Sequence, residues 1–113
     1  MQKPHKTLQV WKQSMDLVID VYRTTEKFPS KEVYGLTNQI RRAAVSVPSN
    51  IAEGAARQTK KEFMNFLHIA QGSLSEMDTQ IELANRLDYI TDKTRNNLDS
   101  QMEQINKMLT GLI

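Results

Sequence analysis

The stretch TKKEFMNFLHIAQGSLSEMDTQIELANRL, residues 59–87, decides the fold of this chain. Its apolar residues recur at alternating spacings of four and three, which places them on one face of an α-helix. They are Phe63, Leu67, Ala70, Leu74, Met77, Ile81 and Ala84. Thr59 and Glu62 form a capping box at the start of the stretch. The sequence therefore predicts a helix over residues 59–87, about 43 Å long at roughly 1.5 Å per residue.

The same period continues on both sides of this helix. Toward the C-terminus, Thr91 or Asp92 is expected to cap a helix with the apolar face Leu98, Met102, Ile105, Leu109 and Leu112. Toward the N-terminus, residues 36–53 are expected to form a helix with the apolar face Leu36, Ile40, Ala43, Val47 and Ile51. Pro48 lies inside this second helix and is expected to kink it, because proline removes a backbone donor. Gly54 suits its C-terminal end.

The first helix differs in carrying two apolar stripes, and Pro29 ends it. One stripe consists of Leu8, Trp11, Met15, Val18 and Tyr22, and the offset one of Leu17, Val21 and Phe28. Trp11 and Tyr22 are expected in the core. The third helix also carries Phe66, Ile69 and Leu83 beside its main face. This surplus predicts either wide core-facing stripes or a surface covered by another copy of the chain.

Four amphipathic segments with short links predict an all-α fold, an antiparallel up-and-down four-helix bundle. The length of 113 residues predicts a single domain over residues 1–113. The chain has no cysteine, which excludes disulfides and favours a reducing compartment. No apolar run approaches the roughly 20 residues of a membrane span. We therefore expect a cytoplasmic protein without a membrane partner.

Charge is unevenly distributed along the chain. Residues 1–61 carry 11 Lys or Arg against 5 Asp or Glu, whereas residues 62–113 carry 4 against 8. The two halves could simply attract each other within the bundle. Alternatively, the N-terminal half could present a basic surface to an anionic partner.

The second helix has two unusual sides. The first is a polar stripe of Gln39, Arg42, Ser46, Ser49, Asn50 and Glu53, which Arg57 would extend. The second carries the small or compact residues Ala44, Val45, Pro48, Ala52 and Ala56, with Arg41 among them. Since Arg42 and Glu53 are three turns apart, each is expected to find its partner elsewhere. The stripe is interpreted as a packing network, as part of a phosphate-binding surface made of Arg41, Arg42, Arg57, Lys60 and Lys61, or as a small-molecule site.

Motifs for catalysis or metal binding are missing from the sequence. His5 and His68 are the only histidines, and neither has metal-ligand spacing. The four glycines are isolated, so no phosphate-binding loop is formed. The expectation is a protein with no catalytic residues, no metal and no cofactor.

A family resemblance covers nearly the whole chain. It is carried by Gly35-Leu36-Thr37, by QIRRAAVSVPSNIAEG at residues 39–54, by KKEFMNFLHIAQGSLSEMDTQ at residues 60–80, by VWKQSMDLVIDVYRTTEKFP at residues 10–29 and by RLDYI at residues 86–90. These segments resemble the four-helix-bundle proteins encoded in 23S rRNA intervening sequences. The chain is also similar to the accessory variability proteins of diversity-generating retroelements. The first resemblance implies an antiparallel four-helix bundle that assembles as a homopentamer and has no enzymatic activity. The second implies a basic pentameric bundle that binds nucleic acid and a reverse transcriptase.

One departure from the family pattern is Ala55-Ala56 before Arg57, where many relatives have an aromatic residue or glycine and often another basic residue. The leading functional hypothesis is a non-enzymatic homo-oligomer that binds structured RNA or another nucleic acid through a basic surface. The alternative is an assembly or adaptor protein whose second helix docks a protein partner, with no nucleic-acid role.

Overall fold

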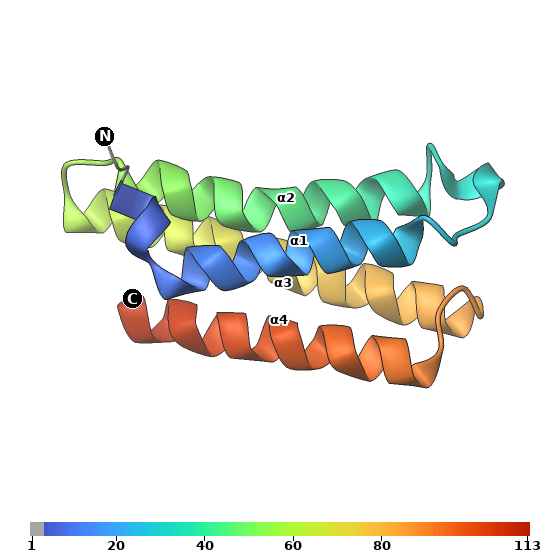
Figure 1. Ribbon diagram of the computed structural model, residues 1–113. Coiled ribbons are helices and arrows are strands. Elements are labelled where there is room, and N and C mark those ends of the chain that lie inside the picture. The colour runs from blue at the N-terminus through green and yellow to red at the C-terminus, as the bar shows by residue number, and fades with distance from the viewer. Residues whose placement is uncertain (1–3) are drawn as a thin grey trace.

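The computed structural model describes residues 4–113 and contains four long helices. These are α1 (Gln9–Thr25), α2 (Leu36–Ala55), α3 (Lys60–Arg86) and α4 (Asp92–Leu112) (Figure 1). Two short 3₁₀ helices, η1 (Pro4–Thr7) and η2 (Ser30–Glu32), precede α1 and α2. No strand occurs within residues 4–113, so the all-α prediction is confirmed for this part of the chain.

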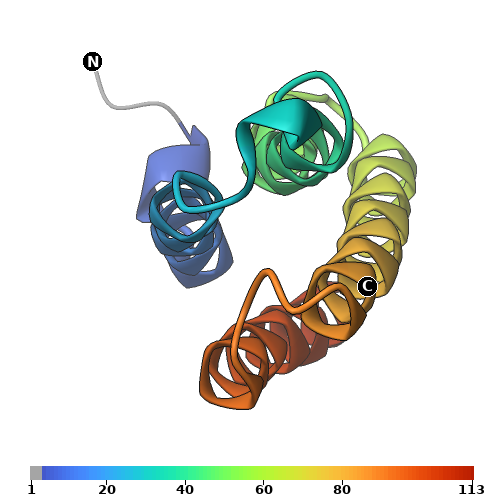
Figure 2. The same ribbon diagram turned by 90° about the vertical axis from the view of Figure 1, so that its right-hand side faces the viewer.

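Each long helix packs against two others, in the cyclic order α1, α2, α3, α4. Among the described residues, no Cα atom of α1 lies within 8 Å of one in α3, and none of α2 lies within 8 Å of one in α4. The end-on view shows α1 and α3 on opposite sides (Figure 2). Figure 1 shows the chain turning back along the long axis at each of its three links. The molecule is elongated, measuring 44 × 23 × 21 Å. The arrangement is that of a four-helix bundle.

Side chains and turns fix where the helices begin and end. The Thr59 hydroxyl accepts from the Glu62 amide at 3.2 Å, and the Thr91 hydroxyl accepts from the Thr94 amide at 3.1 Å. At the end of α3, Asp88 has a φ of 61°, and the Tyr89 amide donates to the Ala84 carbonyl at 2.9 Å. This is a Schellman arrangement, in which the left-handed residue reverses the chain direction. The predicted cap at Thr59 is present, and of the two candidates for the cap of α4 the structure uses Thr91.

The core follows the predicted apolar faces of α2, α3 and α4. Their buried members include Ile40, Val47 and Ile51 on α2, Leu67, Met77 and Ile81 on α3, and Leu98, Ile105 and Leu109 on α4. Two predicted members lie nearer the surface, because they sit at the ends of their helices. Phe63 is half-buried and Leu112 is 38% exposed.

For α1, the predicted core face is wrong in part. Its buried face is Val10, Ser14, Leu17, Val21 and Thr25. The Ser14 and Thr25 hydroxyls donate to the carbonyls of Val10 and Val21 at 2.7 and 2.8 Å, so both are satisfied without water. Tyr22, expected in the core, is 39% exposed, and Trp11 is only partly buried. The predicted core contained only apolar residues, so it left out the buried Ser14 and Thr25.

The glycine at the end of α2 allows α2 and α3 to approach closely. A Cβ added at Gly54 would lie 2.7 Å from the Phe66 Cβ and 3.3 Å from the Phe63 carbonyl oxygen. The Phe66 Cβ and the Phe63 carbonyl oxygen cannot move without moving the backbone of α3. A side chain at position 54 would therefore push the two helices apart. The residue is needed for packing, and α2 continues one residue beyond it to Ala55.

We predict that Gly54→Ala lowers the free energy of unfolding by about 1–3 kcal/mol, because the added methyl overpacks the contact. Thermal and urea unfolding would measure the loss. The matched control is Gly111→Ala on α4, where an added Cβ meets nothing within 4 Å. Equal stability of the two variants would contradict this account of the α2–α3 contact.

The carboxylate of Glu32 ties the α1–α2 link to the α3–α4 link. Its Oε1 accepts from the Leu36 amide at 3.2 Å, and its Oε2 accepts from the Tyr89 hydroxyl at 2.7 Å. The Tyr89 ring packs against Phe28 with ring centroids 5.3 Å apart. Hydrogen bonds from Tyr89 and Leu36 lower the pKa of Glu32, and the bond to Glu32 raises the pKa of Tyr89. The same carboxylate therefore accepts from the first amide of α2 and binds the α3–α4 link through Tyr89.

The hydrogen bonds of Glu32 to Tyr89 and Leu36 predict how the free energy of unfolding depends on pH. Below the ordinary Glu32 value of 4.5, the unfolded state binds the proton more readily than the folded state, so stability is lost as pH falls through the lowered folded pKa. Above the ordinary Tyr89 value of 10.0, the unfolded state releases its proton first, so stability is lost as pH rises. Urea midpoints measured from acid to alkaline pH should show both losses. The Glu32→Gln variant should be less stable at neutral pH and lack the part of the acid-side loss that Glu32 contributes, while the part due to Glu82, whose pKa Arg86 lowers, remains. An unchanged acid profile would contradict the role given to the Glu32 carboxylate.

Candidate nucleic-acid interface

The polar stripe of α2 faces α3 across a surface groove. The groove is lined by Asn38, Gln39, Arg42, Ala43 and Ser46 from α2 and by Ser73 and Glu76 from α3. Gln39, Arg42, Ser49 and Glu53 are exposed, whereas Ser46 and Asn50 are half-buried. One edge of the stripe thus meets the neighbouring helix and the other meets water.

A directed chain of hydrogen bonds forms the inner edge of the stripe. The side-chain Nδ2 of Asn50 donates to the Ser46 carbonyl at 2.8 Å and to the Ser46 hydroxyl at 3.0 Å. The Ser46 and Ser73 hydroxyls lie 2.8 Å apart, and Ser73 donates to the Ile69 carbonyl at 3.2 Å. Because Ser73 gives its one proton to Ile69, Ser46 must donate to Ser73. This part of the stripe joins α2 to α3, as the packing-network interpretation expected.

The expectation that Glu53 needs a partner from another helix or subunit is wrong. Its Oε1 lies 3.1 Å from Nη2 of Arg57, one turn further along the chain. The Arg57 guanidinium also lies over the Phe66 ring, 4.9 Å from its centroid. The chain continues as a helical turn beyond Gly54, and this brings Arg57 back over Glu53. Arg42, by contrast, has no hydrogen bond or ion pair to any residue in the described part of the chain.

The five predicted phosphate-binding residues form two groups. Arg41 and Arg42 lie in the first half of α2, whereas Arg57, Lys60 and Lys61 lie at the α2–α3 link. Arg42 and Arg57 are 15 residues apart. The two groups are therefore separated by roughly 22 Å along the helix axis.

Not all five cations are equally available. The Arg41 Nε donates to the Thr25 hydroxyl at 2.8 Å, and its guanidinium lies 4.5 Å from the centroid of the Tyr22 ring. Arg41 therefore fastens α2 to the end of α1. Lys60 and Lys61 are exposed and, within residues 4–113, have no ion pair. The unpaired cations of the predicted set are Arg42, Lys60 and Lys61.

The charge imbalance between the two halves of the chain is not neutralised by ion pairs between them. Each ion pair among the described residues joins partners from the same half. They are Arg57–Glu53 in the first half, and Arg86–Glu82, Arg95–Glu82 and Lys107–Glu103 in the second. Residues 1–61 consequently keep their basic excess and residues 62–113 their acidic excess.

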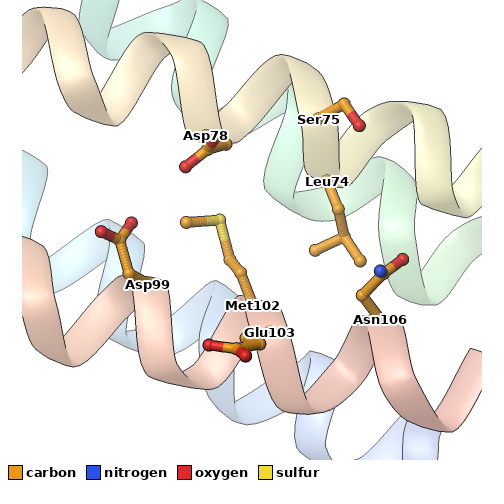
Figure 3. A pocket seen from close by; sticks show the side chains of 7 residues that line it. All are labelled: Leu74, Ser75, Asp78, Asp99, Met102, Glu103 and Asn106. Carbon is orange, nitrogen blue, oxygen red and sulfur yellow. The ribbon is translucent and has the colours of Figure 1, made fainter.

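An acidic groove marks the α3–α4 side. Figure 3 shows the carboxyl groups of Asp78 on α3 and Asp99 on α4 facing one another, with Glu103 beside them and Met102 between the helices. Burial, and then the nearby Asp78 charge, raises the pKa of Asp99. No group of three or more acidic, His or Cys side chains within residues 4–113 has the geometry to hold a metal ion. The sequence did not reveal this groove, because its residues come from two helices.

The fold defines the class of protein as a four-helix bundle, and its unpaired candidate cations are Arg42 on α2 and Lys60 and Lys61 at the start of α3. The chain belongs to the 23S rRNA-intervening sequence protein family, whose model matches residues 6–111. It is similar to a solved protein of unknown function from the S23 ribosomal protein family of Bacteroides thetaiotaomicron VPI-5482. The two are 26% identical with a TM-score of 0.82, over 92% of this chain and 97% of that one. No curated protein matches the chain.

The family resemblance inferred from the SVPSNIAEG region is thus confirmed. None of the helices in the described residues is both long enough and apolar enough to cross a membrane.

The acidic groove yields a stability prediction. A folded pKa raised above the ordinary value of 3.8 means that the ionised Asp99 destabilises the fold at neutral pH, because the folded state holds its proton more tightly. Asp99→Asn should therefore raise the urea midpoint at pH 7. The gain should shrink below about pH 4, where the carboxyl is protonated in both states. A neutral or destabilising effect at pH 7 would count against this description of the groove.

Proposed function

We propose that this protein is a non-enzymatic homo-oligomer that binds structured RNA or another nucleic acid through the α2 side of the bundle. The observation that carries the proposal is the set of unpaired cations, Arg42, Lys60 and Lys61, on a basic half whose charge no cross-half ion pair offsets. The acidic α3–α4 groove would repel phosphates. Binding is therefore expected on one side of the molecule only.

The surroundings of Arg42 suit contact with a nucleic-acid backbone. Asn38, Gln39 and Ser46 line the same groove and offer amide and hydroxyl groups beside the guanidinium. Such groups bind phosphate and sugar oxygens and position a protein without reading sequence. Glu76 on the opposite wall disfavours deep entry of a phosphate. The expected mode is a shallow contact with little sequence preference.

The family resemblance is the reason for proposing a homo-oligomer. We propose an antiparallel up-and-down bundle, bent at Pro48, that assembles as a homopentamer, as the resemblance to its relatives implies. Repetition of a weak basic surface in one particle would raise its avidity for a long polyanion without any new contact. The family description also associates its members with 23S rRNA intervening sequences, which makes structured RNA the first ligand to test.

An assembly or adaptor role is the second candidate. The observation that favours it is an apolar surface groove between α1 and α2, walled on the α2 side by Val45, Pro48 and Ala52. These belong to the small-residue side of α2. Under this alternative, the protein would bind a protein partner there and would not bind nucleic acid.

The nucleic-acid proposal predicts strong salt dependence. With about three phosphate contacts per chain, affinity for a structured RNA should fall roughly 10- to 100-fold between about 50 and 200 mM salt. Reversing the charge of Arg42, Lys60 and Lys61 to Glu should weaken binding and flatten the salt slope. Lys93→Glu, an exposed and unpaired lysine at the start of α4, is the matched control and should leave affinity unchanged. An RNA affinity that changes neither with salt nor in the triple variant would overturn the proposal and favour the adaptor role.

A further inference from the structure

Two opposite charges line the groove between α2 and α3. The guanidinium of Arg42 belongs to the α2 wall and the carboxylate of Glu76 to the α3 wall. Both side chains are exposed, and within residues 4–113 neither has an ion-pair partner. The groove has a volume of about 580 Å³, inside the range of roughly 300–1,000 Å³ that is usual for small-molecule sites. It is therefore large enough for a ligand that contacts both walls.

The α3 side of this groove offers hydrogen-bond acceptors only. The Ser46 hydroxyl donates its proton to Ser73, and the Ser73 hydroxyl donates to the Ile69 carbonyl. Neither hydroxyl has a proton left for a ligand, so both can only accept. The Glu76 carboxylate in the same groove is also an acceptor. A group that binds on this side must bring N–H or O–H donors.

A buried amide holds the Glu76 carboxylate in position. Nε2 of Gln80, a residue only 6% exposed, donates to Oε1 of Glu76 at 3.3 Å. The Gln80 oxygen is itself buried and has no hydrogen-bond partner among the described residues. A carboxylate has about four acceptor sites, so both oxygens of Glu76 can still accept from a ligand. This arrangement suits a ligand with two parallel N–H donors.

Arg42 lies at the edge of the groove and not in its depth. It also lines a second groove, on the α1 side of α2, together with Tyr22 and Arg41. A phosphate bound by Arg42 can therefore stay on the outer surface of α2, away from the Glu76 charge. A group attached to that phosphate can at the same time reach into the α2–α3 groove. In a nucleotide, the base is such a group.

Guanine is the base whose edge matches the α3 side. Its Watson–Crick edge carries N1–H and the N2 amino group side by side, and a carboxylate can accept from both together. Adenine and cytosine each present one amino group beside a ring-nitrogen acceptor, and uracil presents one N–H between two carbonyl oxygens. Those acceptors would face the Glu76 oxygens without a proton between them, which disfavours the other three bases. This edge is free only where guanine is unpaired.

We propose that the α2–α3 groove binds an unpaired guanosine, with Arg42 at its phosphate and the Glu76 carboxylate at its N1–H and N2 amino group. Gln80 is a positioning residue for that carboxylate. The inference rests on the proposed nucleic-acid function and adds to it a preference for guanine at unpaired positions, which backbone contacts alone do not give. Guanosine within an RNA loop and free guanosine monophosphate offer the same chemistry.

The test compares RNA hairpins that differ only in one unpaired loop nucleotide, which is G, A, C or U, at a fixed salt concentration. Wild type should bind the guanosine hairpin roughly 5- to 10-fold more tightly than the others, the lower end of what a bidentate contact provides. Glu76→Gln should abolish this preference and bind the other hairpins at least as tightly as wild type does, because a negative charge near the phosphate is removed. Arg42→Gln should weaken binding of all hairpins by a similar factor.

Glu103→Gln is the matched control, because it removes an exposed carboxylate from α4, far from the α2–α3 groove in sequence. It should leave the guanosine preference unchanged. Circular dichroism and thermal unfolding of each variant would show that the fold is retained. Equal affinity of wild type for all hairpins, or a guanosine preference that survives Glu76→Gln, would overturn the inference while leaving salt-dependent RNA binding and the proposed function intact.

Free nucleotides distinguish the two sources of guanosine. Displacement of the guanosine hairpin by guanosine monophosphate, and not by adenosine monophosphate, would extend the site to free nucleotides. Displacement by neither would assign it to guanosine within RNA. A protein that binds none of the hairpins would contradict the proposed function. In that case, binding of guanosine monophosphate that Glu76→Gln abolishes would still support the groove assignment, and absence of such binding would overturn it as well.

Discussion

The packing of α2 on α3 is the contact on which the rest of the structure depends. It requires a glycine where the helices meet at Gly54 and a hydroxyl pair, Ser46 and Ser73, in the middle. Burying polar groups here is tolerable because each finds a hydrogen-bond partner. With one side of α2 committed to α3 and another to α1, its remaining surface divides into a polar groove and an apolar groove. The two candidate binding surfaces are thus consequences of one packing arrangement.

Much of the fold could be predicted because its signals are local. The four-three spacing from Phe63 to Ala84 and the caps at Thr59 and Thr91 each depend on residues within one helix, and all are present in the structure. The buried Ser14 and Thr25 escaped prediction, because hydroxyls that bond to their own helix behave as small apolar groups. Both 3₁₀ helices were missed, since three or four residues carry too little pattern.

The candidate site was only partly predictable. Sequence identified the polar stripe and the basic residues, but not which cations are already engaged. Arg41 bonds to Thr25 and Arg57 to Glu53, and neither pairing follows from composition. Ser73, Glu76 and the Asp78–Asp99 pair became visible only when helices distant in sequence lay side by side. A contact between helices engages Arg41, and a contact within one segment engages Arg57, so both kinds of contact decide which cations remain free.

The proposed function depends on the uneven charge of the two halves of the chain, residues 1–61 and residues 62–113. The most direct measurement is lysine reactivity footprinting of the intact protein, with and without a structured RNA, read by mass spectrometry. The account predicts that Lys60 and Lys61 at the start of α3 lose reactivity when RNA is added, while Lys93 and Lys107 on α4 keep theirs. Equal protection of all four lysines, or protection confined to α4, would contradict it.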